Sequence, residues 1–153
     1  MQALRSRAAT LEDVALLAQM NKRLIDDERA RNPMSLEQLE ARMRNWLERG
    51  KYQGELFLQG DEVVAYALYR LSPDEYYPEQ AVAYIRHFYV ERGRRRQGVG
   101  RAALKALAST RFPAGCTVSV DVLATNHGGH QFWSKMGFKP YLTNMKVNGE
   151  EVV

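Results

Sequence analysis

Cysteine is nearly absent from this chain of 153 residues, and with Cys116 alone no disulfide can form within it. Long apolar runs are absent too, since none approaches the roughly 18 residues that a membrane-spanning helix needs. The first twenty residues mix charged with apolar side chains, which is unlike a secretory signal peptide. We therefore expect a cytoplasmic protein with no membrane partner.

Two motifs of other protein classes are also missing. A Walker phosphate-binding loop needs Gly-Lys followed by Ser or Thr, and no such triplet occurs. No cysteine and histidine pairs occur at zinc-ligand spacing, so we expect no metal. Repeats and linkers are absent as well, and the length suits one domain over residues 1–153.

The charge is unevenly distributed. Residues 1–85 hold 11 Lys and Arg against 14 Asp and Glu, whereas residues 86–153 hold 11 against 4. An acidic half suits a cationic acceptor and a basic half suits a polyphosphate cofactor. Ordinary solvated charge is the better explanation of the acidic half. The basic half differs because its arginines cluster beside glycines.

Apolar periodicity predicts an α/β domain, a mixed sheet with helices on both faces in the order β-α-α-β-β-β-α-β-α-β. Thr10 is a good N-cap for the first helix, and Ser35 with Gln38 forms a capping-box pattern for the second. The expected strands are residues 3–8, 52–59, 63–71, 81–90, 117–123 and 138–147. The expected helices are residues 11–28, 36–50, 98–109 and 126–136.

The stretch from Tyr84 to Gly100 concentrates residues that suit an anion. A predicted strand leads into an arginine-rich turn, and Gly98 and Gly100 then open a helix. Glycine lacks a Cβ, so its backbone can approach a bulky anion, and the first N–H groups of a helix have no partner inside it. The stretch therefore predicts a pyrophosphate seat. Guanidinium contacts to phosphate would come from Arg92, Arg94, Arg95 and Arg96.

Gly98 to Ala103 also matches the dinucleotide fingerprint G-x-G-x-x-A, with Asp121 about twenty residues further on. The context excludes that reading. A Rossmann turn places its first glycine directly at a strand end in a βαβ unit. Here residues 91–97 intervene, an antiparallel hairpin comes first, and Asp121 lies inside its expected strand.

Arg95 to Gly100, with the sequence RRQGVG, resembles the acetyl-CoA-binding signature of the GNAT N-acetyltransferase superfamily. A second segment is similar to that family as well: Asn126 follows a strand, an aromatic pair comes next, and Gly137 precedes Phe138. The two motifs and the elements between them span residues 81–147. The predicted element order is also the order expected of GNAT folds, whose central parallel strands splay apart.

The resemblance implies acetyl-CoA as the co-substrate. Backbone N–H groups of residues 96–101 would hold the pyrophosphate, and the main chain of residues 88–90 would pair with pantetheine and polarise the thioester carbonyl. Asn126 would bond the pantetheine arm, or act as a plain helix N-cap, and the two roles are compatible. Phe132 would flank the cofactor or belong to the core. The implied cofactor residues are Phe88, Tyr89, Val90, Arg95, Arg96, Gln97, Gly98, Val99, Gly100, Arg101, Asn126, Phe132 and Trp133.

Family enzymes usually let the amine attack acetyl-CoA directly, so an ammonium of pKa about 10.4 must first lose its proton, and the leaving thiolate benefits from an acid. The sequence departs from the family pattern here. Trp133 stands where the family commonly has a tyrosine acid, and an indole N–H does not serve as one. Arg86 and His87 stand where a carboxylate is common.

Three residues are candidates for catalysis. His87 would act as the base, directly or through water, or would be a satisfied structural histidine. Glu28 would hold or deprotonate a cationic acceptor, or be a solvated helix end. Tyr141 is a replacement acid, and solvent alone could also suffice.

We therefore expect an acetyl-CoA-dependent N-acetyltransferase acting on a primary amine of a small metabolite, an aminoglycoside-like polyamine or a protein. Two alternatives stay open. One is a non-catalytic acyl-CoA sensor, which Trp133 favours, and the other is a basic nucleic-acid-binding domain. The acyl chain length is open, a homodimer is compatible with the sequence, and no specific nucleic-acid partner is expected.

Overall fold

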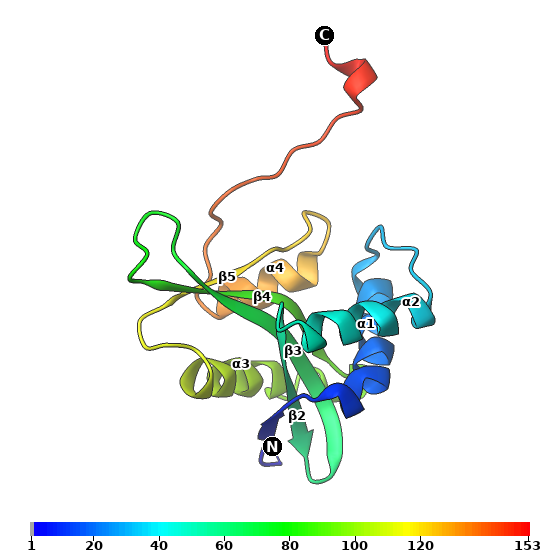
Figure 1. The fold of residues 1–153 in the computed structure, drawn as a ribbon, viewed down its shortest axis with the longest axis vertical. Helices are drawn as coiled ribbons and strands as arrows, with labels where there is room; N and C mark the ends of the chain where they lie inside the picture. Colours follow the sequence, from blue (N-terminus) through cyan, green and yellow to red (C-terminus); the bar gives the residue numbers. More distant parts are fainter. Residues whose placement is uncertain (1) are drawn as a thin grey trace. The chain divides into compact units, whose positions relative to one another are not determined.

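The computed structural model describes residues 2–153, and their contacts divide the chain into two compact units that meet at the Leu123–Ala124 bond. The first unit contains a five-stranded sheet with its helices, and the second contains α4 (His127–Lys135) and the chain that follows it (Figure 1).

The helices of the first unit begin where the sequence predicts. Thr10 caps a short 3-10 turn, η1 (Leu11–Asp13), that leads into α1 (Val14–Glu28), and its side chain accepts from the N–H of Glu12. Ser35 and Gln38 form the expected capping box at α2 (Leu36–Glu48). Helix α3 (Val99–Thr110) buries the apolar stripe Val99, Ala103, Leu104 and Leu107.

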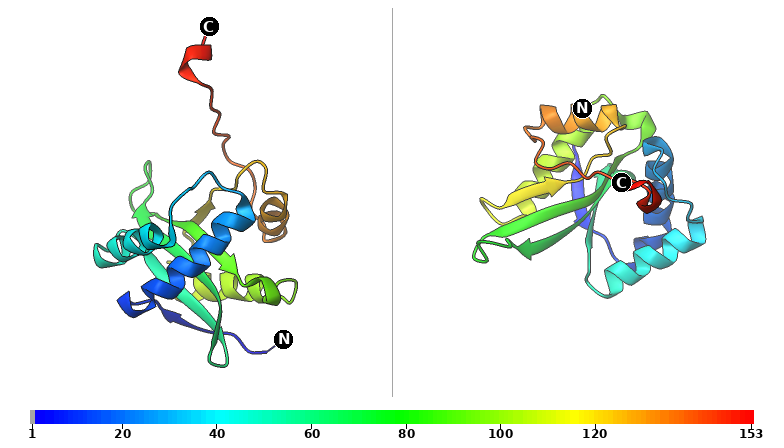
Figure 2. Two further views of the ribbon diagram at one scale, coloured as in Figure 1. Left: turned by 90° about the vertical axis from the view of Figure 1, so that its right-hand side faces the viewer. Right: turned by 90° about the horizontal axis from the view of Figure 1, so that it is seen from above.

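The sheet has the order β1-β2-β3-β4-β5. Its strands are β1 (Arg5–Ala8), β2 (Gln53–Gln59), β3 (Glu62–Pro73), β4 (Ala81–Val90) and β5 (Thr117–Val120). The first four pair antiparallel and β5 joins β4 in parallel. Helices α1 and α2 cover one face and α3 covers the other (Figure 2). The predicted mixed α/β architecture is confirmed.

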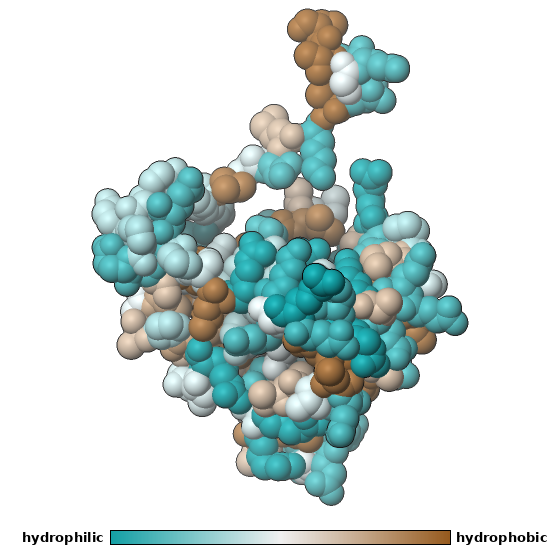
Figure 3. Space-filling model, viewed as in Figure 1, coloured by the Kyte–Doolittle hydropathy of each residue, from teal (hydrophilic) through white to brown (hydrophobic). Residues whose placement is uncertain are grey.

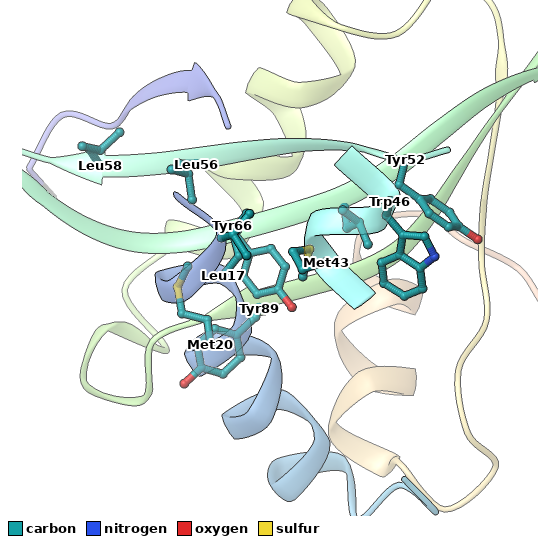
Figure 4. Close-up of a cluster of buried hydrophobic side chains, with 11 residues drawn as sticks. Leu17, Met20, Met43, Trp46, Tyr52, Leu56, Leu58, Tyr66 and Tyr89 are labelled. Carbon is teal, nitrogen blue, oxygen red and sulfur yellow. The ribbon is translucent and has the colours of Figure 1, made fainter. Parts of the chain in front are cut away.

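The core on the α1 and α2 face is unusually aromatic. Trp46 from α2 packs edge-on against Tyr52, with ring centroids 5.0 Å apart, and the strands contribute Tyr66 and Tyr89 (Figure 4). Met43 and Trp46 of α2 are both buried here. Full burial of side chains of this size stabilises the fold by roughly 1.5–3 kcal/mol each.

Strand β5 pairs with only part of β4. Their register runs from Val82 opposite Thr117 to Ile85 opposite Val120, whereas β4 continues along β3 as far as Val90. The expected separation of the two central parallel strands therefore begins after Ile85. The segment of β4 that leads to the arginine-rich turn lies beyond the β5 pairing.

A β-bulge interrupts β4 at the same place. Leu68 faces His87, the next β3 residue faces Ile85, and the register skips Arg86. Strict alternation would place Arg86 and His87 on opposite faces, but a bulge re-aims side chains. Both now lie against Trp46, with the guanidinium carbon of Arg86 4.9 Å and the His87 ring centroid 5.8 Å from its ring centroid.

The predicted last strand is wrong. Residues 138–147 contain no strand, and β5 ends at Val120 rather than at residue 123. Alternating apolar residues make a strand only where a partner strand accepts the hydrogen bonds, and Pro140 has no N–H to donate. The apolar side chains of this segment stand in the open (Figure 3). They are Tyr141, Leu142, Met145 and Val147.

His87 is a buried histidine, only 9% exposed. Its Nδ1 lies 3.1 Å from the hydroxyl oxygen of Tyr66, which is fully buried. Burial, with the nearby charges of Arg42 and Arg86, lowers the pKa of His87 from 6.5 to about 3. The imidazole is therefore neutral in the folded protein at neutral pH.

This burial makes stability depend on pH. The unfolded chain protonates His87 near pH 6.5 and the folded chain only near pH 3, so the free energy of unfolding falls as the pH drops through that window. We expect His87→Gln to flatten the fall between pH 7 and pH 4.5, measured by urea denaturation at a series of pH values. The ionised, paired carboxylates of Asp13 and Asp27 lose their contribution only below about pH 3.8.

The matched control is His127→Gln, because His127 is exposed. This variant should keep the wild-type pH dependence. If the free energy of unfolding of His87→Gln fell with pH as steeply as that of the wild type, the pKa of His87 would not be lowered by burial.

Candidate functional site

The N-terminus of α3 has no side-chain cap. Gly98 occupies the N-cap position with φ of 81°. By contrast, Thr10, Ser35 and Asn126 place side-chain oxygens at the starts of η1, α2 and α4. No capping side chain therefore accepts a hydrogen bond from the backbone N–H groups in the first turn of α3. These N–H groups lie at the positive end of the helix dipole. This arrangement suits an anion.

The turn before α3 is held by ion pairs rather than left open. Asp27, at the end of α1, forms ion pairs with two arginines. Its carboxylate oxygens lie 2.6 Å from Nη2 of Arg92 and 2.5 Å from Nη2 of Arg95. Arg95 also donates from Nε to the carbonyl of Val90 at 2.9 Å. Burial raises the pKa of Asp27, but the hydrogen bonds from Arg95 and Arg92 outweigh it and leave the pKa below its usual value.

The four arginines of the turn therefore have different roles. Arg92 and Arg95 neutralise Asp27, and Arg94 pairs with Glu62 and donates to Gln59. Arg96 adopts φ of 62°, a left-handed conformation that few residues other than glycine adopt. Within residues 2–153, Arg96 and Arg101 form no ion pair with a carboxylate, and both are exposed. The charges of these two are therefore not neutralised by a carboxylate of the described residues.

A second group of arginines lies on the α1 and α2 face of the sheet, around Trp46. We call it the arginine–aromatic cluster, and it consists of Arg42, Trp46, Tyr52, Arg70 and Arg86. Arg42 and Arg86 place their guanidinium carbons 4.4 Å and 4.9 Å from the Trp46 ring centroid. Arg70 and Arg86 both donate to the Tyr52 hydroxyl, at 2.9 Å and 3.5 Å.

Sequence reasoning missed this cluster. Its members come from α2, from the connection after it, from β3 and from β4. No local motif links them, and the net acidity of residues 1–85 conceals the concentrated positive charge. The spacing of Arg42 and Trp46, i and i+4 on one helix, was the only local signal.

Glu28 lies near the buried Tyr66, on the α1 and α2 face of the sheet. It is half-buried at the end of α1. Burial is the main cause of the raised pKa of Tyr66, Arg42 opposes it, and the Glu28 charge adds to it. Tyr66 is therefore near both a carboxylate and a guanidinium, with His87 as its hydrogen-bond partner.

The remaining predicted residues lie in the second unit. Asn126 caps α4 by accepting from the N–H of Gly129 at 3.0 Å, so its N-cap role is confirmed. Phe132 and Trp133 stack edge to face at 5.0 Å, and Trp133 is buried. Tyr141 is 93% exposed in a segment without helix or strand.

Among residues 2–153, no group of three or more His, Cys, Asp or Glu side chains is arranged to hold a metal ion. No described helix combines the length and apolarity needed to cross a membrane.

Solved structures share this fold. A possible acetyltransferase from Clostridium difficile 630 is 18% identical, with 98% of both chains covered and a TM-score of 0.76. A predicted acetyltransferase from Clostridium acetobutylicum, solved with acetyl-CoA, is 19% identical over 98% of this chain and 99% of that one, with a TM-score of 0.75. An aminoglycoside acetyltransferase from an uncultured soil metagenomic sample is 16% identical over 95% of both chains, with a TM-score of 0.72.

No curated protein sequence matches the chain. The model of the acetyltransferase (GNAT) family matches residues 18–138. That range includes the arginine-rich turn, α3, β5 and α4, and it covers most of the chain. The chain belongs to the acetyltransferase (GNAT) family.

Proposed function

We propose that this protein is an N-acetyltransferase that binds acetyl-CoA at the turn between β4 and α3 and passes the acetyl group to a primary amine. The observation that carries the proposal is the uncapped N-terminus of α3, with Gly98 at its N-cap and the unneutralised Arg96 and Arg101 beside it. A pyrophosphate matches both the N–H groups and the two cations. The acetyl-CoA in the Clostridium acetobutylicum neighbour supports the choice of ligand.

The rest of the cofactor would run along β4. The β5 pairing ends at Ile85, so the main chain of residues 88–90 lies beyond it, as an added strand of pantetheine requires. One N–H group of this segment would polarise the thioester carbonyl. The family resemblance also assigns Gln97, Asn126, Phe132 and Trp133 to the cofactor, and that assignment stays a prediction.

In the proposed reaction the amine nitrogen attacks the thioester carbonyl carbon in a ternary complex, the C–S bond breaks, and coenzyme A leaves as the thiolate. The ammonium must first give up a proton. A histidine whose pKa is about 3 has little tendency to take it, so we assign His87 to holding Tyr66. Glu28, near the same Tyr66, is our proposed base, and Tyr141 as the acid stays a prediction.

Two other functions make different predictions. A non-catalytic acyl-CoA sensor would bind acetyl-CoA and acetylate no amine. A nucleic-acid-binding domain would need free cations in the arginine-rich turn, but Arg92, Arg94 and Arg95 are already paired with carboxylates. The ion pairs therefore favour the acetyl-CoA seat.

The seat is tested by a matched pair of variants at Gly98. Asn and Asp both tolerate the left-handed conformation found there, so Gly98→Asn and Gly98→Asp differ mainly by one negative charge. We expect calorimetry to show that Gly98→Asp binds acetyl-CoA at least about tenfold more weakly than Gly98→Asn, a difference of about 1.4 kcal/mol. Equal affinities would place the pyrophosphate elsewhere.

The base is tested by Glu28→Gln. Loss of a positioned base typically lowers the rate by roughly 10²- to 10⁴-fold, so we expect kcat to fall by that order while acetyl-CoA affinity stays unchanged. The control is Asp26→Asn, an exposed carboxylate on the same helix end. If Glu28→Gln keeps full kcat, or if Asp26→Asn loses as much, Glu28 is not the base.

A further inference from the structure

Arg42 and Arg86 form a pair of like charges that the chain does not neutralise. Both guanidinium groups lie over Trp46, and the Arg86 charge adds to burial in lowering the pKa of Arg42. Neither they nor Arg70 form an ion pair with a carboxylate within residues 2–153. By contrast, three arginines of the turn are paired: Arg92 and Arg95 with Asp27, and Arg94 with Glu62. Arg23 is paired with Glu91, whereas Arg96 forms no such pair in the described part of the chain.

Arg42 also carries an unmet hydrogen-bond donor. Its Nε is buried and has no partner among the described residues. A buried N–H without an acceptor destabilises the folded chain, and more strongly on a charged group. An oxyanion bound by the outer N–H groups of both guanidinium groups would offset the repulsion between them.

The position of the pair connects it to the proposed reaction. Arg86 lies on β4, two residues before Phe88, where the proposed pantetheine segment begins. The bulge turns Arg86 toward α2, which carries Arg42. The charges of Arg42 and Glu28 both affect the pKa of Tyr66, so both groups lie near it. A carboxylate and a pair of guanidinium groups therefore lie on the same face of the sheet.

We propose that the acceptor is a small amine that also carries an oxyanion, a carboxylate or a phosphate, and that Arg42 and Arg86 bind this oxyanion while Glu28 faces the ammonium. This inference rests on the proposed acetyltransferase function. It names the acceptor as an amino acid or an aminoalkyl phosphate rather than a polyamine, because two unneutralised guanidinium groups repel a ligand that has only positive charges.

The test compares two pairs of acceptors, each pair sharing a carbon frame and differing in the anionic group, and adds spermidine as a polyamine. Wild-type protein with acetyl-CoA is offered leucine, leucinamide, phosphoethanolamine, ethanolamine and spermidine, and acetylation is followed by mass spectrometry. A charge-assisted hydrogen bond is worth about 1.5–3 kcal/mol, so the anionic member of each pair should have about 10- to 100-fold higher kcat/KM, mainly through KM. The preferred pair distinguishes a carboxylate site from a phosphate site.

The variants Arg42→Gln and Arg86→Gln should lose this preference while acetyl-CoA affinity stays at the wild-type value. Arg44→Gln is the matched control, since Arg44 is exposed on the same helix and outside the cluster. Calorimetric binding of N-acetylleucine and N-acetylphosphoethanolamine gives a readout that needs no turnover, and both arginine variants should weaken it.

Different results would overturn the oxyanion site and the acetyltransferase function. Acetylation of leucinamide, ethanolamine or spermidine as fast as the anionic acceptors would overturn the oxyanion site and leave the acetyltransferase intact. So would a preference that survives in both arginine variants, since the arginines would then only cover Trp46 by cation–π contact. Absence of acetyl-CoA binding would overturn the proposed function itself. Binding of acetyl-CoA without binding of either acetylated product would overturn the oxyanion site alone.

Discussion

The two ion pairs of Asp27 hold the turn between β4 and α3 to the end of α1. Without them Arg92, Arg95 and Arg96 would be three exposed arginines without a carboxylate partner on one short loop, and their mutual repulsion would oppose a single conformation. With them, Arg92 and Arg95 become anchors, and the positive ends that remain are Arg96, Arg101 and the first N–H groups of α3. The proposed seat is therefore organised before any anion binds, which would lower the ordering cost of binding.

A second constraint acts on the acceptor side of β4. The bulge at Arg86 and the end of the β5 pairing at Ile85 fall at adjacent positions on one strand. Together they leave the distal part of β4 beyond the β5 pairing and bring Arg86 and His87 to the same aromatic ring. One strand thereby links the proposed thioester site to the proposed acceptor site. The neutral, buried His87 holds this strand to Tyr66 on β3.

Much of this was predictable from sequence, because it is local. Caps at Thr10 and Ser35, the inward face of α3 and the glycine at its N-cap all follow from residues within a few positions of one another. The signature RRQGVG also pointed to the correct family. The phosphate contacts of its arginines stay a prediction, and the motif gives no sign of the ion pair between Arg95 and the distant Asp27.

What sequence could not provide is non-local. The bulge follows from how β3 and β4 align, the arginine–aromatic cluster from four elements meeting at Trp46, and the low pKa of His87 from burial. Residues 138–147 show the opposite error, since their pattern predicts a strand that has no partner in the described structure. An apolar alternation specifies which face a strand would bury, and says nothing of whether a neighbouring strand is there.

The most direct test is amide hydrogen exchange with and without saturating acetyl-CoA. We expect slower exchange at two places, the amides of residues 88–90 at the end of β4 and those of Val99, Gly100 and Arg101 at the start of α3. Protection at both would place the pantetheine on the strand and the pyrophosphate on the helix. Protection that spares both segments, or no protection at a saturating concentration of acetyl-CoA, would contradict the proposed seat.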